Sequence, residues 1–299
     1  MTSFLNDLKS LKFNYKLGKK TWFGTGGNST FYIEIDSEIN LQKLLKLLPY
    51  SIPIFVLGDG SNIIVRDGGF DGLTIKLKGN LKKINYDKSK NFLTIGGAVK
   101  DSTISKFCED NLITDFEFLR GIPGTLGGNI MMNAGCYGKT ISDNLISCNV
   151  ISRSGKVNYF KKEEIKFSYR KSSIDSRSIV TSATFKVKNL CKNKILKNIT
   201  KISKTRASTQ PINFRTGGST FKNPPNQSAW KLIDKINYRG KSIGDASVSE
   251  KHANFLINNN HARSLDLEML GEEIKENIKK KYNVNLDWEL LRIGKFKKI

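Results

Sequence analysis

Three glycine-rich segments beside apolar, strand-like runs constrain the fold of this 299-residue chain more than any other feature. They are Gly24–Asn28, Gly58–Asn62 and Gly121–Gly128, and Asn133-Ala134-Gly135 follows the last. Glycine accepts positive φ and brings backbone N–H groups close to an anion, so such loops suit a pyrophosphate. A single glycine loop is most often an ordinary turn, so two interpretations stay open: three turns, or a nucleotide-type cofactor site. Neither a GxGxxG nor a Walker lysine motif is present, which argues against a Rossmann or P-loop site.

Hydrophobic periodicity predicts strands that alternate with a few helices. Short β-branched runs predict strands at 31–35, 52–58, 62–67, 73–79, 92–99, 145–152, 156–160, 178–187 and 286–294. Helical spacing is found at 41–49, 101–113, 229–236 and 265–281, and residues 189–208 are polar and helical towards their end. One face of the 101–113 helix carries Ile104, Phe107, Cys108 and Leu112. The pattern is that of helices packed on sheets, in two or three folding units.

The helix at 265–281 has the clearest end signals. Its apolar stripe consists of Leu267, Leu270, Ile274 and Ile278. We expect Ser264 to cap its N-terminus, Asp266 and Glu268 to suit the positive end, and Lys279–Lys281 the negative end.

The formal net charge of +23 raises the question of anionic partners. Forty Lys and ten Arg are scattered along the chain without an Arg-rich arm, which favours an anionic small molecule over a polynucleotide.

Four cysteines without CxxC spacing and two histidines predict neither a disulfide framework nor a metal site. The N-terminal MTSFLNDLKSLKF lacks an export-signal core, and no apolar run is long enough for a membrane span. We therefore expect a cytoplasmic protein.

Six motifs occur in an order that resembles a known family. They are LGDGSNIIVRDGGFDG, GIPGTLGGNIMMNAGCYG, FSYRKSS, GSTFKNP, SIGDASVSEKHANFLIN and LDWELLRIG. Together they resemble the MurB family of UDP-N-acetylenolpyruvoylglucosamine reductases over about residues 17–294. Any one motif would be unspecific, whereas the combination is highly specific.

The resemblance implies an α+β fold. Residues 17–195 would form an FAD-binding domain of the vanillyl-alcohol-oxidase/p-cresol-methylhydroxylase (VAO/PCMH) type, with two subdomains divided near residue 80. Residues 196–299 would form a C-terminal α/β domain that binds the UDP-sugar. Arg170 and Arg206 are separated by 36 positions, which resembles the subclass without an inserted substrate loop.

The resemblance also assigns roles to residues. Ser219 matches the family's proton donor, and Arg170 and Glu289 match residues that polarise the enolpyruvyl carboxylate. Taken alone, Ser219 would be a turn serine, Arg170 a solvated arginine and Glu289 a surface strand residue. The expected substrate-binding residues are Tyr169, Arg206, Gln210, Lys222 and Asn223. The expected cofactor-binding residues are Gly58, Gly60, Ser61, Asn62, Gly121, Ile122, Pro123, Gly124, Thr125, Gly128, Asn133, Ala134 and Gly135. His252 and Asn254 fit either a supporting or a purely structural role.

The implied enzyme is a flavin-dependent oxidoreductase of peptidoglycan precursor synthesis, with non-covalently bound FAD and NADPH as co-substrate. It would act on a UDP-sugar as a monomer, without nucleic-acid or membrane partners. The alternatives are a basic nucleic-acid-binding protein and another PCMH-type flavin oxidase with covalent FAD, for which Cys136 is the one anchor in the glycine loops. Two positions depart from the family pattern: Asp59 stands where glycine is commonest, and Trp288 where proline is frequent.

Overall fold

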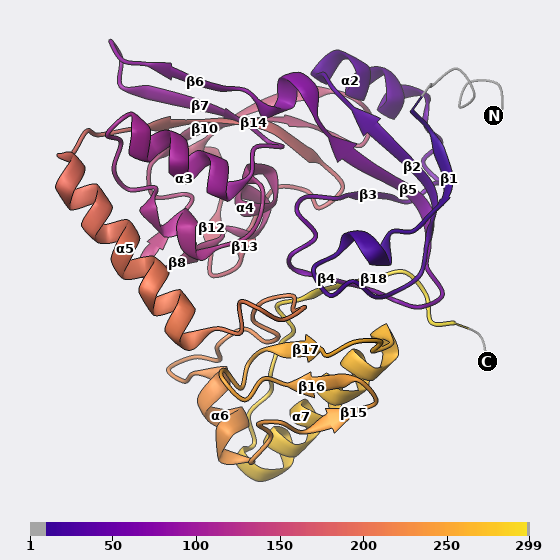
Figure 1. Ribbon diagram of the computed structural model, residues 1–299. Helices are drawn as coiled ribbons and strands as arrows, with labels where there is room; N and C mark the ends of the chain where they lie inside the picture. Colours follow the sequence, from indigo (N-terminus) through magenta and orange to yellow (C-terminus); the bar gives the residue numbers. More distant parts are fainter. Residues whose placement is uncertain (1–9, 298–299) are drawn as a thin grey trace. The chain divides into compact units, whose positions relative to one another are not determined.

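The structure is a computed structural model that describes residues 10–297 (Figure 1). The predicted lack of an export signal concerns a segment whose residues 1–9 lie outside the described part. The chain divides into two compact units, each assembled from separate stretches of sequence. The first unit contains residues 33–59 and 74–205, and the second contains residues 12–32, 60–73 and the chain from Arg206 on. Each unit therefore folds from segments that are far apart in the sequence.

These units do not coincide with two contiguous halves of the chain. The expected limit between residues 195 and 196 falls inside helix α5 (Lys192–Thr209). Segment 60–73 belongs to the second unit because residues 63–65 pair with residues 291–293. Segment 12–32 is tied to the same unit by hydrogen bonds from Asn258 to Phe23 and from Thr25 to Ala262. The domain limits 17–195 and 196–299, with the subdomain division near residue 80, stay a prediction.

The main sheet of the first unit has five antiparallel strands in the order β11-β10-β14-β7-β6 (Figure 1). Helix α4 packs against β14 and β7, and apolar side chains of α3 and α4 share one core with this sheet. Burying this face of the sheet under helices provides most of the unit's hydrophobic stabilisation. The bounds are β6 (Ile84–Asp87), β7 (Phe92–Gly96), β10 (Leu145–Ile151), β11 (Val157–Lys161), β14 (Ile179–Lys186), α3 (Asp101–Asp110) and α4 (Leu126–Met132).

A second sheet has the strand order β1-β2-β5-β3, and the division into units falls within β2 and β5. Helix α2 begins at Ser37, whose hydroxyl accepts a hydrogen bond from the Asn40 N–H group. The bounds are β1 (Lys12–Tyr15), β2 (Ser29–Ile35), β3 (Ile54–Val56), β5 (Phe70–Leu77) and α2 (Glu38–Leu47). Two short antiparallel pairs are β8 (Gly135–Cys136) with β9 (Lys139–Thr140), and β12 (Phe167–Ser168) with β13 (Lys171–Ser172). Single 3-10 turns are η1 (Gly18–Lys20), η2 (Gly79–Lys82), η3 (Glu117–Gly121) and η4 (Lys162–Glu164).

The second unit is a three-stranded antiparallel sheet, β15-β16-β17, packed on helix α7. Strand β4 pairs in parallel with β18, so residues near position 64 lie beside residues near position 292. Buried side chains of α6, α7 and the sheet share one apolar core. The bounds are β4 (Ile63–Val65), α6 (Ala229–Lys235), β15 (Ser242–Ile243), β16 (Ala246–Val248), β17 (Leu256–Asn258), α7 (Ser264–Tyr282) and β18 (Leu291–Ile293).

The structure confirms the predicted helices and most strands, and it corrects two details. The helix expected at 101–113 ends at Asp110, and Leu112 is 40% exposed with φ of 59°. Leu112 is therefore no part of the buried helix face. Ser264 is also not the cap of α7: it is the first helical residue, and its buried hydroxyl has no partner among the described residues.

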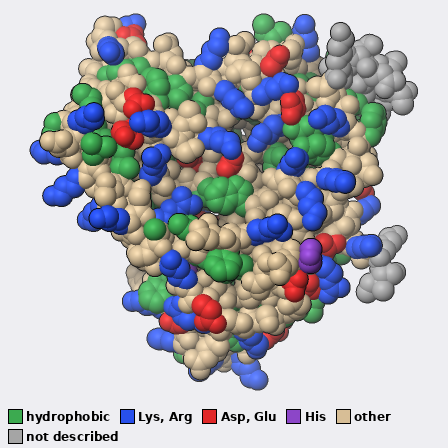
Figure 2. Space-filling view, in the orientation of Figure 1, with side chains coloured by type: hydrophobic (Ala, Val, Ile, Leu, Met, Phe, Trp, Pro, Cys, Tyr) green, Lys and Arg blue, Asp and Glu red, His purple; other side chains and the backbone are tan. Residues whose placement is uncertain are grey.

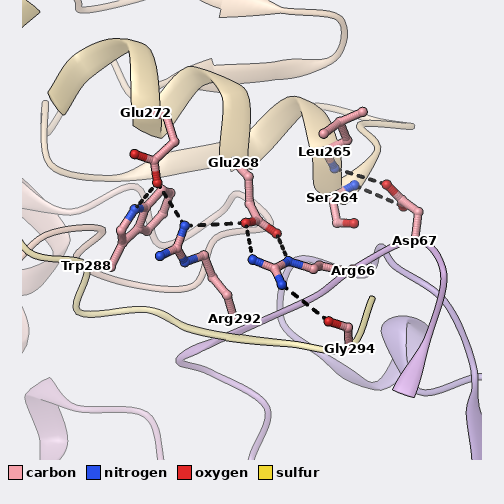
Figure 3. Close-up of polar contacts among 9 residues, drawn as sticks. All are labelled: Arg66, Asp67, Ser264, Leu265, Glu268, Glu272, Trp288, Arg292 and Gly294. Atoms are coloured by element: carbon pink, nitrogen blue, oxygen red, sulfur yellow. Dashed lines mark hydrogen bonds and ion pairs between the residues drawn. The ribbon is translucent and has the colours of Figure 1, made fainter. Parts of the chain in front are cut away.

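Helix α7 is capped instead from a distant part of the sequence (Figure 3). The Asp67 carboxylate accepts hydrogen bonds from the N–H groups of Ser264 and Leu265, at 3.1 and 3.0 Å. One turn further on, Glu268 forms ion pairs with Arg66 and Arg292 while its side chain is only 5% exposed. The loop after β4 therefore satisfies the helix N-terminus and fixes α7 beside β18.

Candidate active site

Gly58 from one glycine-rich segment and residues 124–127 from another contribute to one backbone cradle in the first unit. Gly124 accepts a hydrogen bond from the Asp101 N–H group, and Leu126 and Gly127 donate to Val99 and Gly97. A Cβ atom at Gly58 would lie 2.9 Å from Thr125 Oγ1. Only glycine at position 58 allows this close approach between the loop after β3 and the start of α4.

The third glycine-rich segment has a different explanation. Gly26 has φ of 109°, and a Cβ atom there would lie 1.9 Å from the Val65 carbonyl oxygen. Its neighbour Gly27 donates to the Arg66 carbonyl oxygen. Packing against the end of β4 therefore accounts for Gly26 and Gly27 without a ligand.

Asn133 is an expected cofactor-binding residue with unused hydrogen-bonding capacity. It ends α4 with φ of 45°, and its amide nitrogen donates to the Ser168 carbonyl oxygen at 3.1 Å. Its buried Oδ1 atom has no hydrogen-bond partner within residues 10–297. Because a buried acceptor without a partner is costly, this atom fits a donor on a bound cofactor.

Tyr169 and Arg170 form the two-residue turn between β12 and β13. Arg170 has φ of 56°, a conformation that costs a non-glycine residue roughly 1–2 kcal/mol. Two contacts hold this hairpin on the end of α4: Asn133 donates to Ser168, and the Ser172 hydroxyl donates to the Met131 carbonyl oxygen. The guanidinium of Arg170 lies 5.1 Å from the centre of the Tyr169 ring. The elements that carry the glycine cradle therefore also position Arg170.

Ser219 and Glu289 are brought together in the second unit. The Glu289 N–H group donates to the Thr220 carbonyl oxygen at 2.8 Å, so Glu289 lies beside the residue that follows Ser219. On the other side, Asn254 accepts from the Phe221 N–H group and donates to its carbonyl oxygen. Ser219 and Glu289 are both half-buried. Asn254 therefore holds the backbone next to Ser219, a contact that fits both roles that the sequence left open.

Six further predicted residues lie in the second unit. Ser61 is buried, and the Asn62 amide donates to the Glu289 carbonyl oxygen, so the loop before β4 supports the Ser219–Glu289 pair. The Asn223 side chain accepts from the Ala229 N–H group at the start of α6, which gives it a structural contact. Arg206, Gln210 and Lys222 are half-buried residues of the second unit.

Sequence reasoning missed Lys76, Lys100, Asp101 and Asn129, which surround the glycine cradle. Asp101 and Asn129 are buried and hydrogen-bonded at 2.6 Å. Burial raises the pKa of Asp101 to about 8, the Asn129 hydrogen bond acts against this, and Asp59 adds to it. The pattern at 101–113 identified an apolar helix face and carried no sign of this inward-facing carboxyl group.

Comparison with known proteins identifies the class and then the family. Residues 29–159, which include most of the cradle, match the model of an FAD binding domain, so the chain is a flavoprotein. Residues 210–293, which carry Ser219 and Glu289, match the model of the UDP-N-acetylenolpyruvoylglucosamine reductase C-terminal domain. The expected α+β fold, an FAD-binding domain followed by this C-terminal domain, is confirmed.

Relatives match over nearly the whole chain. The UDP-N-acetylenolpyruvoylglucosamine reductase of Rickettsia prowazekii is 42% identical over 95% of this chain and 96% of its own length. That of Rickettsia bellii is 44% identical over 94% of this chain and 93% of its own. The crystal structure of the Thermus caldophilus enzyme superposes with a TM-score of 0.81 at 29% identity, covering 95% of this chain and 98% of that one. The chain belongs to the family of UDP-N-acetylenolpyruvoylglucosamine reductases.

Proposed function

We propose that this chain reduces UDP-N-acetyl-3-O-(1-carboxyvinyl)-glucosamine to UDP-N-acetylmuramate, with FAD as cofactor and NADPH as the source of electrons. The observation that carries the proposal is the backbone hydrogen bond from Glu289 to Thr220, the residue after Ser219, within a region that matches the reductase C-terminal domain. The residues of the cradle would hold FAD non-covalently, and the bound flavin would be the source of the hydride for C3 of the enolpyruvyl group. The chain's own residues then complete the addition across the double bond.

Each catalytic residue has one task in this proposal. As hydride reaches C3, negative charge builds on C2 and on the adjacent carboxylate. The Arg170 guanidinium can stabilise this charge with a bidentate pair of hydrogen bonds. The Ser219 hydroxyl then gives its proton to C2. Glu289 assists at the carboxylate either in a protonated form or by ordering a partner, because a bare carboxylate would repel that of the substrate.

The substrate's uridine and diphosphate need cationic and amide donors. We assign this role to Arg206, Gln210, Lys222 and Asn223, and we propose Tyr169 as a further substrate-binding residue. For the cofactor we propose the residues Gly58, Gly60, Ser61, Asn62, Gly121, Ile122, Pro123, Gly124, Thr125, Gly128, Asn133, Ala134 and Gly135. The unpartnered Oδ1 atom of Asn133 and the tight Gly58–Thr125 approach support this set.

Ser219→Ala tests the reaction most directly. Flavin reduction by NADPH should stay nearly intact, while oxidation of the reduced flavin by the enolpyruvyl substrate should slow by at least about a hundredfold. Ser219→Cys keeps an ionisable proton and should recover part of the loss. In deuterium oxide the product should carry deuterium at C2. Rapid-mixing absorbance resolves the two half-reactions, and equal slowing of both with loss of FAD would mean that Ser219 only shapes its loop.

We also propose that the enzyme acts as a cytoplasmic monomer without a nucleic-acid partner. Within residues 10–297, no helix is both long and apolar enough to cross a membrane. Lys and Arg side chains are dispersed over the visible face, interrupted by acidic and uncharged areas (Figure 2). Such dispersal does not form the continuous basic track of a polynucleotide site. Sub-micromolar, sequence-dependent DNA or RNA binding at physiological salt would contradict this proposal.

A further inference from the structure

Three charged side chains gather around the loop that follows β3. The Lys100 ammonium lies 2.7 Å from the Asp59 carboxylate, whose side chain is only 14% exposed. The Lys76 ammonium, on β5, donates a hydrogen bond to the carbonyl oxygen of Gly58. Two cations and one anion therefore meet at a glycine whose Cβ atom would collide with Thr125.

Asp59 would be unfavourable for an anionic ligand if it acted alone. It is the acidic member of a loop expected to approach a pyrophosphate, where the family most often has glycine. The Lys100 ammonium offsets the negative charge of Asp59, and Lys76 adds a second positive charge. The net charge around the loop therefore stays positive and suits an anionic ligand. Nearby Asp101 adds little negative charge at neutral pH, since burial raises its pKa to about 8.

Lys76 is in an unusual environment for a lysine. It is half-buried, and burial lowers its pKa, while Asp59 raises it and Lys100 lowers it. Keeping an ammonium group in such a place is costly unless an anion compensates it. Asp59 is already paired with Lys100, so a second anion beside Lys76 would stabilise its charged form.

We propose that Lys76 is a cofactor-binding residue of this chain, whose ammonium group at Gly58 stabilises the negative charge of the FAD pyrophosphate while Lys100 balances Asp59. The glycine backbone of the loop supplies directed N–H groups, and Lys76 supplies the net charge that they lack. The inference depends on the FAD-binding domain and not on the proposed reaction, so its failure would leave the assignment of Ser219 untouched.

The test is the dissociation constant of FAD for the full-length protein, stripped of flavin and titrated by flavin fluorescence. Lys76→Gln removes the charge but keeps a donor for Gly58, and should raise this constant about tenfold or more, where tenfold is 1.4 kcal/mol. Lys76→Arg should stay within about threefold of the unmodified protein. Lys78→Gln is the matched control, because Lys78 pairs at 2.9 Å with Glu34 instead of with the loop. It should bind FAD as the unmodified protein does.

Two further measurements separate a charge effect from local misfolding. At 1 M salt, where the Debye length is about 3 Å, the difference between Lys76→Gln and the unmodified protein should shrink. The double variant Asp59→Asn/Lys76→Gln restores the local net charge and should recover at least part of the affinity. An unchanged dissociation constant in Lys76→Gln, a loss that does not depend on salt, or a double variant weaker than Lys76→Gln would each overturn the proposal.

Discussion

At the scale of single residues, Arg170 combines an assigned role with an unfavourable backbone conformation. Its φ of 56° is one that glycine adopts readily and arginine does not. The hairpin contacts to α4 hold it there. A strained residue that the surroundings keep in place is common at functional sites, and the strain predicts a conflict between stability and activity.

Arg170→Gly should expose this conflict. The variant removes the strain at φ of 56°, so its free energy of unfolding should be equal to or up to about 1 kcal/mol above that of the unmodified protein. Loss of the guanidinium should lower kcat/KM by about a hundredfold or more. Urea unfolding and steady-state kinetics measure the two effects. Arg177→Gly, which removes an exposed arginine of the first unit, should leave kcat/KM unchanged, and a similar loss there would point to a general effect of charge.

Asp101 predicts a dependence of stability on pH. Its pKa of about 8 in the folded protein is well above the usual 3.8, because the group is buried. Between these two values the unfolded chain loses this proton while the folded chain keeps it. The group therefore lowers the stability of the folded protein progressively as pH rises from about 4 to about 8.

Asp101→Asn removes that titration. The variant should gain stability relative to the unmodified protein as pH rises, reaching roughly 1–5 kcal/mol near pH 8.5 and little near pH 4, since one pKa unit is about 1.4 kcal/mol. Urea unfolding at three pH values measures the trend. Asp110→Asn, at the exposed end of the same helix, should stay within about 0.5 kcal/mol throughout. A difference that is independent of pH would show that Asp101 is ionised in the folded protein.

At the scale of elements, the cap of α7 shows where local sequence rules end. The sequence indicated Ser264, since serine is a frequent cap and stands where the apolar stripe begins. The structure places the carboxylate of Asp67 at this helix end instead, across nearly two hundred positions of sequence. Asp266 assists, because its carboxylate accepts from the Arg263 N–H group. Local spacing located the helix, but a cap from a distant loop depends on tertiary contacts.

The two capping assignments predict opposite mutational effects. Asp67→Ala should lower the free energy of unfolding by about 1–2 kcal/mol, because two N–H groups lose their acceptor. Ser264→Ala should be neutral or slightly stabilising, since the buried hydroxyl has no partner in the described part of the chain. Urea denaturation of both variants measures the two changes in the free energy of unfolding. A larger loss for Ser264→Ala than for Asp67→Ala would restore the assignment from sequence.

At the scale of the whole molecule, the sequence predicted the family, the fold class and most elements, because these depend on periodicity and on ordered motifs. It could not predict the charged surroundings of the cradle. Lys76, Lys100 and Asp101 occur in ordinary sequence contexts, and only the folded chain brings them to Gly58 and Gly124. It also could not show that residues 12–32 and 60–73 fold with the chain beyond Arg206.

The parallel pairing of β4 with β18 has a consequence for biosynthesis. Ile63–Val65 can complete its pairing only after Leu291–Ile293 has left the ribosome. At about 5–20 residues per second, the intervening chain takes roughly 10–50 seconds to translate. The first unit can close its core once its last strands emerge, whereas β4 must wait until residues 291–293 have been made. For that interval an apolar strand stays without its final neighbour, which leaves its edge open to pairing with other chains.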